Sequence, residues 1–402
     1  MSLISVDEAL RRVLATVERP VGVETLPLAA CAGRILAEPL AATRDQPPFR
    51  ASAMDGYAVR HADIPDVPTT LRLVGESAAG HGFAGAVEKG TAVRIFTGAP
   101  VPAGADTVVI QEDTEAEDGE VAVRERPRPE QFVRPAGLDF RTGDVLLAAG
   151  QRLDGRHVAL AASMGHGTLP VRRPPLVAIL STGDELVRPG EAPAPDQIVA
   201  ANPYAVGAIV ERAGGKALDL GIARDRIEAL QERITAAEEA GADLLVTLGG
   251  ASVGEHDLVQ TALARKGMAL GFWRVALRPG KPLMHGRLGA MGLLGLPGNP
   301  VSSVVCSILF LVPALRALMG DPEAGSDPTE PARLAVDLGP NDTRQDYMRA
   351  TLQDGTVTPH RKQDSSMLGI LARSNALLVR PPHAPAAKAG EPCRIIRLDR
   401  FC

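Results

Sequence analysis

The sequence predicts a multidomain α/β plus β protein, with a central parallel α/β domain, an inserted mainly β module and a small C-terminal β-barrel domain. Helix-like and strand-like segments alternate between residues 175 and 325, which is typical of βαβ units. Short strands punctuated by glycine dominate two other stretches, and the 402 residues leave room for several domains. The expected domains are 1–45 with 141–174 (a discontinuous linking domain), 46–140 (the β module), 175–325 (α/β) and 326–402 (C-terminal).

The α/β domain is expected to begin with a strand at 176–180, a continuous apolar run of the kind buried on both faces of a parallel sheet. Right-handed crossovers then connect further strands through helices. The other expected strands are 217–222, 244–248 and 291–296, and the expected helices are 204–213, 227–240, 258–266 and one that follows Pro300.

Shorter segments with turn signals between them define the remaining parts of the chain. An N-terminal helix is expected because Val6, Leu10, Val13, Leu14 and Val17 recur at helical spacing. Strands are expected in the β module at 71–74, 92–96, 107–111 and 120–123, and in the C-terminal domain at 334–338, 347–352, 377–379 and 393–398.

Composition excludes several classes of protein. The net charge of −5 and the 3% of aromatic residues disfavour a nucleic-acid binder. The four cysteines form no CxxC pair, so we expect reduced thiols, a cytoplasmic location and no zinc site. The most apolar stretch, 301–315, is shorter than a bilayer span and contains serines and Pro313, so we interpret it as a buried core helix rather than a membrane segment.

Polar loops follow each of the four expected parallel strands. Ligands of open α/β sheets bind outside the carboxyl ends of the strands, so these loops are expected to share one edge. Glycines let backbone N–H groups approach a ligand, and a helix N-terminus favours an anion, although the same residues also suit a plain turn. The residues that could bind substrate in this way are Gly249, Gly250, Ser252 and Gly254 in one loop, and Pro297, Gly298, Asn299 and Pro300 in another.

Carboxylates from three of these loops favour a cation beside the anion site. Glu185, Asp225 and Asp257 would repel a phosphate unless a metal intervened, and Mg²⁺ is bound by a few carboxylates together with phosphate oxygens. Asp257 could instead cap the helix that follows it. Arg278 and Lys281 flank a Pro-Gly turn and could bind an oxyanion, although a solvated basic turn explains them equally well.

Six strings along the chain resemble the MoeA family of molybdopterin molybdenumtransferases, which includes the gephyrin E domain. They are SAMDGYA (52–58), TGAPVP (97–102), STGDEL (181–186), GGASVGEHD (249–257), PGKP (279–282) and LPGNPVS (296–302). From residue type alone, the first two could be structural turns. The resemblance implies an elongated homodimer of four-domain subunits. It also implies that molybdate is inserted into adenylylated molybdopterin, with Mg²⁺-dependent release of AMP.

The resemblance also implies the roles of particular residues. The catalytic acids would be Asp55, Asp139, Glu185, Asp225 and Asp257, with the catalytic Thr97 beside them. Asp225 and Asp257 would also hold the metal. The residues that bind the oxyanion would be Arg278, Lys281, Ser302, Arg349 and Ser365. Asp55 and Thr97 would complete a site across the dimer. A molybdopterin adenylyltransferase and molybdoenzyme acceptors or chaperones would be the other partners.

Two alternatives stay open, and the first rests on positions at which the chain departs from the family pattern. Ala200 stands near the place of a family carboxylate, Arg226 replaces a frequent second acid after Asp225, and Asp364 adds a negative charge beside the expected anion site. These changes motivate a molybdopterin-binding scaffold or regulator with weak catalysis. A molybdopterin adenylyltransferase shares some of the same loops, but would lack the β module and the C-terminal domain.

Overall fold

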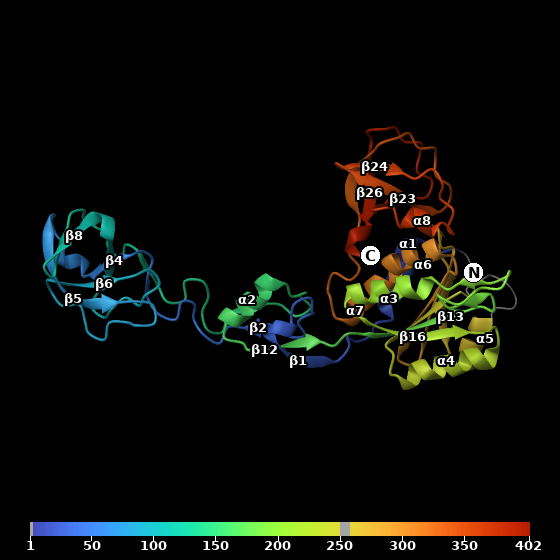
Figure 1. Cartoon of the computed structure of the whole chain (residues 1–402), viewed down its shortest axis with the longest axis horizontal. Helices are drawn as coiled ribbons and strands as arrows, with labels where there is room; N and C mark the ends of the chain where they lie inside the picture. Colours follow the sequence, from blue (N-terminus) through green and yellow to red (C-terminus); the bar gives the residue numbers. More distant parts are fainter. Residues whose placement is uncertain (1–2, 250–257) are drawn as a thin grey trace.

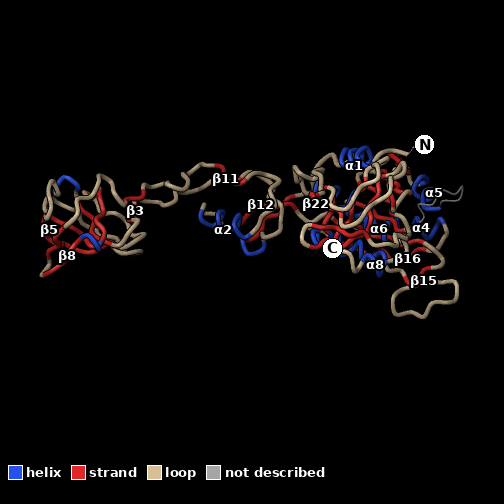
Figure 2. The backbone as a smooth tube through the Cα atoms, turned by 90° about the horizontal axis from the view of Figure 1, so that it is seen from above, coloured by secondary structure: helices blue, strands red, loops and turns tan. Residues whose placement is uncertain are grey.

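The computed structural model describes residues 3–249 and 258–402 of an elongated molecule (Figure 1). The β module lies at one end, the linking domain in the middle, and the α/β domain at the other end with the C-terminal domain beside it. Figure 2 shows the same order from above, with thin connections on both sides of the linking domain. The expected fold class is confirmed by this arrangement.

The central sheet of the α/β domain is mixed rather than wholly parallel. Its order is β16 (Lys216–Ala223), β13 (Leu176–Thr182), β17 (Leu244–Leu248), β21 (Met291–Leu296), β20 (Pro282–Leu288) and β18 (Ala269–Arg274). The first four strands are parallel, as expected, but β20 and β18 add an antiparallel edge. The strand β20 was not among the expected strands. A tight turn at Gly289, with φ of 59°, joins it to β21.

Helices bury both faces of this sheet. One face meets α3 (Asn202–Ala213) and a continuous helix made of α6 (Pro300–Cys306), a π-helical turn (Ser307–Leu311) and α7 (Val312–Leu318). The other face meets α4 (Ile227–Glu239) and α5 (Leu258–Arg265). The helix over 300–318 is long and apolar enough to cross a membrane, but 78% of its apolar 18-residue window is buried inside the protein. It therefore serves as a core helix here, as the sequence indicated.

The N-terminal helix α1 (Val6–Ala15) packs on the α/β domain rather than on the linking domain. Val6, Ala9 and Val13 are buried in the same core as α7 and α3. Ile4 forms a bridge with Val275. The expected assignment of residues 1–45 to one linking domain therefore differs from the structure at this helix, because an amphipathic pattern does not say which domain its apolar face covers.

The linking domain joins two separate stretches of chain. β1 (Val23–Pro27) pairs with β12 (Thr168–Arg172), and β2 (Leu40–Ala41) pairs with β11 (Val145–Leu147). Its helix, α2 (Gly155–Ser163), begins at Asp154, whose side chain accepts hydrogen bonds from the Arg156 and His157 N–H groups. The β module is consequently inserted between strands of this domain.

The β module is a six-stranded sheet that curls around two small cores. Its strands run in the order β7 (Thr107–Ile110), β4 (Gly56–Val59), β6 (Thr91–Ile95), β5 (Thr69–Ser77), β9 (Glu120–Val123) and β8 (Thr114–Glu117). Only β5 and β6 are parallel. A two-stranded pair, β3 (Ala51–Ser52) and β10 (Val133–Arg134), leads to the linking domain.

The C-terminal domain is a closed β-barrel. β23 (Gln345–Gln353), β24 (Thr356–Pro359), β22 (Glu330–Leu334), β26 (Pro392–Arg397) and β25 (Ala376–Arg380) pair in turn, and β25 returns to β23. Strand β19 (Leu277–Arg278) of the α/β domain adds to β23, which ties the two domains together. The remaining short elements are α8 (Leu368–Leu371), the β14–β15 pair (Leu186–Val187 with Ile198–Val199) and 3-10 turns at Leu28–Ala30, His61–Asp63, Gln111–Asp113 and Leu398–Arg400.

His285 on β20 makes the α/β domain sensitive to acid. The residue is 2% exposed, and its Nδ1 lies 3.0 Å from the carbonyl oxygen of Leu293. Burial lowers the pKa of His285, although the Leu293 carbonyl opposes that shift. The unfolded chain therefore binds a proton at a higher pH than the folded protein does. Stability should fall as the pH drops through the unfolded value of about 6.5, by up to about 1.4 kcal/mol per pH unit for this one proton.

The single tryptophan, Trp273, lies on the neighbouring strand β18, so its fluorescence reports unfolding of this domain. Urea midpoints measured between pH 5 and 7.5 should decline toward acid in the native sequence and decline less steeply in His285→Gln. The exposed His81 provides the matched control, His81→Gln, which should keep the native slope. Equal slopes for His285→Gln and the native protein would contradict this assignment.

Candidate functional site

A cavity of about 960 Å³ opens at the carboxyl ends of the parallel strands. Each of β13, β16, β17 and β21 contributes the residues that follow it, and the C-terminal domain contributes one wall. The candidate residues on the cavity wall are Glu185, Asp225, Gly249, Arg278, Lys281, Pro297, Gly298, Asn299, Pro300, Ser302 and Ser365. The structure thus brings together residues that are widely separated in the sequence, at the edge where ligands of such sheets bind.

Glycines allow the loops at this edge to approach one another. A side chain at Gly249, whose φ is 93°, would stand 2.9 Å from the Thr182 carbonyl oxygen. A side chain at Gly298 would lie 3.7 Å from the Gly249 Cα, and one at Gly183 would collide with the Glu185 carboxylate. The backbone therefore borders the cavity directly, which suits a ligand held by N–H groups.

The acidic side of the cavity concentrates negative charge with little compensation. Burial raises the pKa of Asp225, the neighbouring Asp184 and Glu185 raise it further, and a hydrogen bond to the Asp184 backbone lowers it. Separately, the Asp225 N–H donates to the Asp184 carboxylate at 3.3 Å. Among the described residues, Arg224 lies 4.0 Å from the Asp184 carboxylate and donates to the Asp184 carbonyl oxygen at 2.8 Å. A bound cation would relieve this repulsion.

The basic side contains three cations, of which Arg278 has the most extensive ion pairing. Arg278 forms a forked ion pair with Asp346, and its Nη1 lies 3.2 Å from Asp342. Lys281 is exposed and lines the cavity. Arg344, which the sequence analysis did not select, lines the cavity too and lies 3.5 Å from Asp342. Lys281 and Arg344 are therefore better placed than Arg278 to attract an anion.

The C-terminal domain closes the cavity through residues 363–365. The Val301 N–H donates to the Ser365 carbonyl oxygen at 3.1 Å, which joins this segment to the start of α6. Arg349, expected to bind substrate, is only 1% exposed and is not on the cavity wall. Its Nη2 donates to the Asp364 carbonyl oxygen at 2.9 Å, and its N–H donates to the Gln363 side chain. Arg349 is buried in the barrel behind the cavity wall. Its hydrogen bonds to Gln363 and Asp364 hold that part of the wall in place.

The candidate residues of the β module lie far from this cavity within one chain. Thr97 donates to one Asp55 oxygen from both its N–H, at 2.7 Å, and its hydroxyl, at 2.8 Å. These bonds, together with Arg94, lower the pKa of Asp55. Asp55 immediately precedes β4, at the opposite end of the molecule from β13 (Figure 1). Asp139 lies in the connection to the linking domain, where its N–H donates to the Gln46 carbonyl oxygen at 2.9 Å.

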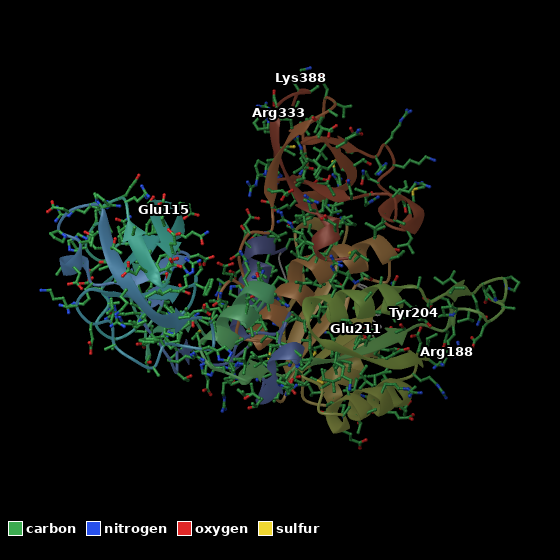
Figure 3. All side chains as sticks on the ribbon, turned by 60° about the vertical axis from the view of Figure 1, so that its left-hand side comes forward. Glu115, Arg188, Tyr204, Glu211, Arg333 and Lys388 are labelled. Carbon is green, nitrogen blue, oxygen red and sulfur yellow. The ribbon has the colours of Figure 1, made fainter. Side chains whose placement is uncertain are left out.

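The side-chain view in Figure 3 makes the same separation visible. Glu115 lies on the β module, whereas Tyr204 and Arg188 lie on the α/β domain. Four candidates, Gly250, Ser252, Gly254 and Asp257, fall outside the described residues. Among the residues that are described, no group of three or more His, Cys, Asp or Glu side chains forms a ready metal cage.

Comparison with known proteins assigns the family. Residues 4–165 match the MoeA N-terminal region (domain I and II), 178–317 match a probable molybdopterin binding domain, and 331–398 match the MoeA C-terminal region (domain IV). The chain belongs to the MoeA family. It is a transferase of molybdenum cofactor biosynthesis, as its similarity to curated relatives bears out.

Relatives cover nearly the whole chain. A molybdopterin molybdenumtransferase of Nostoc sp. is 37% identical over 93% of this chain and 88% of its own length. One from Haemophilus influenzae is 35% identical over 97% of both chains. A solved molybdopterin biosynthesis MoeA protein from Pyrococcus horikosii superposes with a TM-score of 0.86 at 30% identity, over 98% of this chain and 99% of that one.

Within this MoeA chain, two of the noted departures fall on the cavity wall. Ala200 is 6% exposed and lines the cavity, held by a hydrogen bond from its N–H to the Val187 carbonyl oxygen at 2.9 Å. Asp364 lines it as well, but its carboxylate accepts the Ser366 N–H at 2.9 Å and the Ser366 hydroxyl at 2.6 Å. The negative charge of Asp364 is therefore partly offset by the two hydrogen bonds from Ser366 within the same turn.

Proposed function

We propose that this MoeA-family chain inserts molybdate into adenylylated molybdopterin and releases AMP in an Mg²⁺-dependent reaction. The observation that carries the proposal is the polarity of the cavity, with carboxylates at Glu185 and Asp225 on one side and the cations Lys281 and Arg344 on the other. Such a cavity suits a substrate that carries both a metal-bound phosphoanhydride and a separate oxyanion.

The residues present fit a magnesium ion at the acidic side. Asp225 carries a carboxylate whose pKa is raised by burial and then by Asp184 and Glu185, so a divalent cation there would replace repulsion by attraction. In this proposal Asp225 and Asp257 hold the ion. When bound, Mg²⁺ would neutralise charge on the phosphoanhydride oxygens.

The protein's own residues would act mainly by positioning. Cleavage of a phosphoanhydride needs alignment and neutralisation of charge rather than covalent chemistry. Backbone N–H groups of the Gly298-Asn299 turn just before α6 would orient the phosphates, and Ser302 and Ser365 would contact the oxyanion with Lys281. Glu185 or Asp55 would orient water or accept a proton.

The proposal extends to assembly and partners. Asp55 and Thr97 would reach the cavity of the partner subunit in a homodimer, because they cannot reach it within their own chain. A molybdopterin adenylyltransferase would supply the substrate, and molybdoenzyme acceptors or chaperones would receive the finished cofactor in the cytoplasm.

Release of AMP tests the reaction directly. Purified protein incubated with adenylylated molybdopterin, Mg²⁺ and molybdate should release AMP together with molybdenum cofactor. Lys281→Ala should lower kcat/KM for molybdate by about tenfold to a hundredfold, because a charge-assisted contact with an anion contributes roughly 1.5–3 kcal/mol.

Lys216→Ala is the matched control, since Lys216 is an exposed lysine at the opposite end of the sheet from the cavity. No AMP release by the native protein, with a known family enzyme active in parallel, would overturn the proposal. Consumption of ATP with molybdopterin in place of AMP release would favour the adenylyltransferase alternative. Substrate binding without turnover would favour a scaffold.

A further inference from the structure

A second cavity, of about 940 Å³, lies where three domains meet. The linking domain contributes residues 148–152, the α/β domain contributes the end of α3 and one side of α7, and the C-terminal end of the chain contributes Arg400 and Phe401. The cavity shares no lining residue with the candidate active site. Nothing in the proposed reaction uses it.

Four arginines line this second cavity, and two of them lack a carboxylate partner among the contacts of the described residues. Arg316 is paired with Asp321 at 2.7 Å, and Arg400 is paired with Glu330. Arg152 instead donates to the carbonyl oxygens of Gly33 at 2.8 Å and Ala213 at 3.1 Å.

Arg212 donates to the carbonyl oxygen of Asp399. Two guanidinium groups with only neutral acceptors remain available to an anion, and the guanidinium fork matches a phosphate group.

The acids of the cavity do not cancel this charge. Asp327 lies 3.1 Å from Arg394 and also accepts from Thr329, so it is largely occupied. Glu323 is the remaining carboxylate on the wall. Burial lowers the pKa of Arg152, Asp321 raises it, and Arg316 lowers it. Arg152 is exposed, so an anion in the cavity can reach its guanidinium group.

The other walls are apolar. Ile209, Val312, Pro322, Pro328 and Phe401 line the same cavity as the arginines. An apolar wall with one aromatic ring beside a cationic cluster suits a ligand with a flat, weakly polar part and a charged end. A bare inorganic anion would leave most of this volume unfilled.

We propose that this cavity is a binding site for a phosphate-bearing small molecule of mononucleotide size, with its phosphate between Arg152 and Arg212 and its ring against Phe401. The proposal concerns a different cavity and does not depend on the proposed reaction. Such a ligand joins the linking domain to α3 and to the C-terminal end of the chain. Binding therefore restricts motion at the joint, meaning the contact between the linking domain, α3 and the C-terminal end of the chain. The orientation of the β module relative to the α/β domain depends on this joint.

Hydrogen exchange with AMP as the probe locates the binding. The informative peptides cover residues 148–152, 209–213 and 396–402, which line the second cavity or adjoin it. With AMP at ten times its Kd, amides in these peptides that exchange only when the three domains separate should exchange about tenfold more slowly than without AMP. Arg212→Glu should remove this protection while retaining any protection at 181–186 and 297–302, which report the first cavity. Arg212 is exposed, so the substitution leaves the core untouched.

Arg233→Glu, an exposed arginine on α4 outside both cavities, is the matched control and should behave as the native protein does. Protection confined to the first cavity in the native protein would overturn the proposal. Protection of the joint that survives in Arg212→Glu would overturn it as well. Loss of AMP-releasing activity in any variant leaves these outcomes unchanged, because exchange is measured with AMP alone.

Discussion

Asp225→Asn is expected to remove most of the AMP-releasing activity while leaving the fold intact. The substitution keeps the shape of the side chain and removes the charge that would hold Mg²⁺. Because metal-bound phosphoanhydride cleavage depends on several kcal/mol of charge stabilisation, kcat should fall on the order of a hundredfold or more at saturating Mg²⁺.

Stability should move in the opposite direction, which separates a catalytic loss from unfolding. The pKa of Asp225 is raised in the fold, first by burial and then by Asp184 and Glu185, so its ionised form weakens the folded state at neutral pH. Without Mg²⁺, the Tm of Asp225→Asn should equal or exceed the native Tm. Mg²⁺ should raise the Tm of the native protein, and this increase should be absent in Asp225→Asn.

Asp196→Asn provides the matched control, because Asp196 is an exposed acid on the same domain that does not line the cavity. It should keep the native kcat and the native response to Mg²⁺. Native activity in Asp225→Asn would remove Asp225 from the metal site. A lower Tm without Mg²⁺ would show that its carboxylate supports the fold instead.

The sequence predicted the location of those site residues whose position follows from the order of strands and helices. Parallel strands bring their carboxyl ends to one edge, so Glu185, Asp225 and Gly298 could be placed together from the order of elements alone. Glycines at the ends of strands indicated close backbone approach, as the structure has it at Gly249.

Interactions between domains were not accessible in this way. Arg278 appeared as a free cation because its partner, Asp346, lies 68 residues away in another domain. Arg344 was overlooked because no local pattern marks it, and Arg349 was expected on the cavity wall although it supports that wall from behind. Each of these outcomes depends on how the barrel docks on the sheet, and spacing along the chain does not encode that docking.

Heterodimers of two impaired variants are expected to regain activity, at limiting molybdate, if the site is shared between subunits. Asp55→Ala damages only the β module, and Lys281→Ala damages only the cavity, at opposite ends of one chain (Figure 1). In a two-fold dimer with shared sites, one of the two sites in the heterodimer receives both intact halves, so it should have about half of native activity per dimer. Co-expression with two different affinity tags isolates this species for the AMP-release measurement.

A control heterodimer distinguishes a site shared between subunits from a site within one chain. Asp55→Ala combined with Thr97→Ala is the matched control, because both substitutions lie in the β module and leave neither site intact. That heterodimer should have no more activity than its parents. If Asp55 and Lys281 served a site within one chain, the first heterodimer would also show only the low activity of its parents. Recovered activity therefore requires the carboxylate that Thr97 holds in one subunit to act at the cavity of the other.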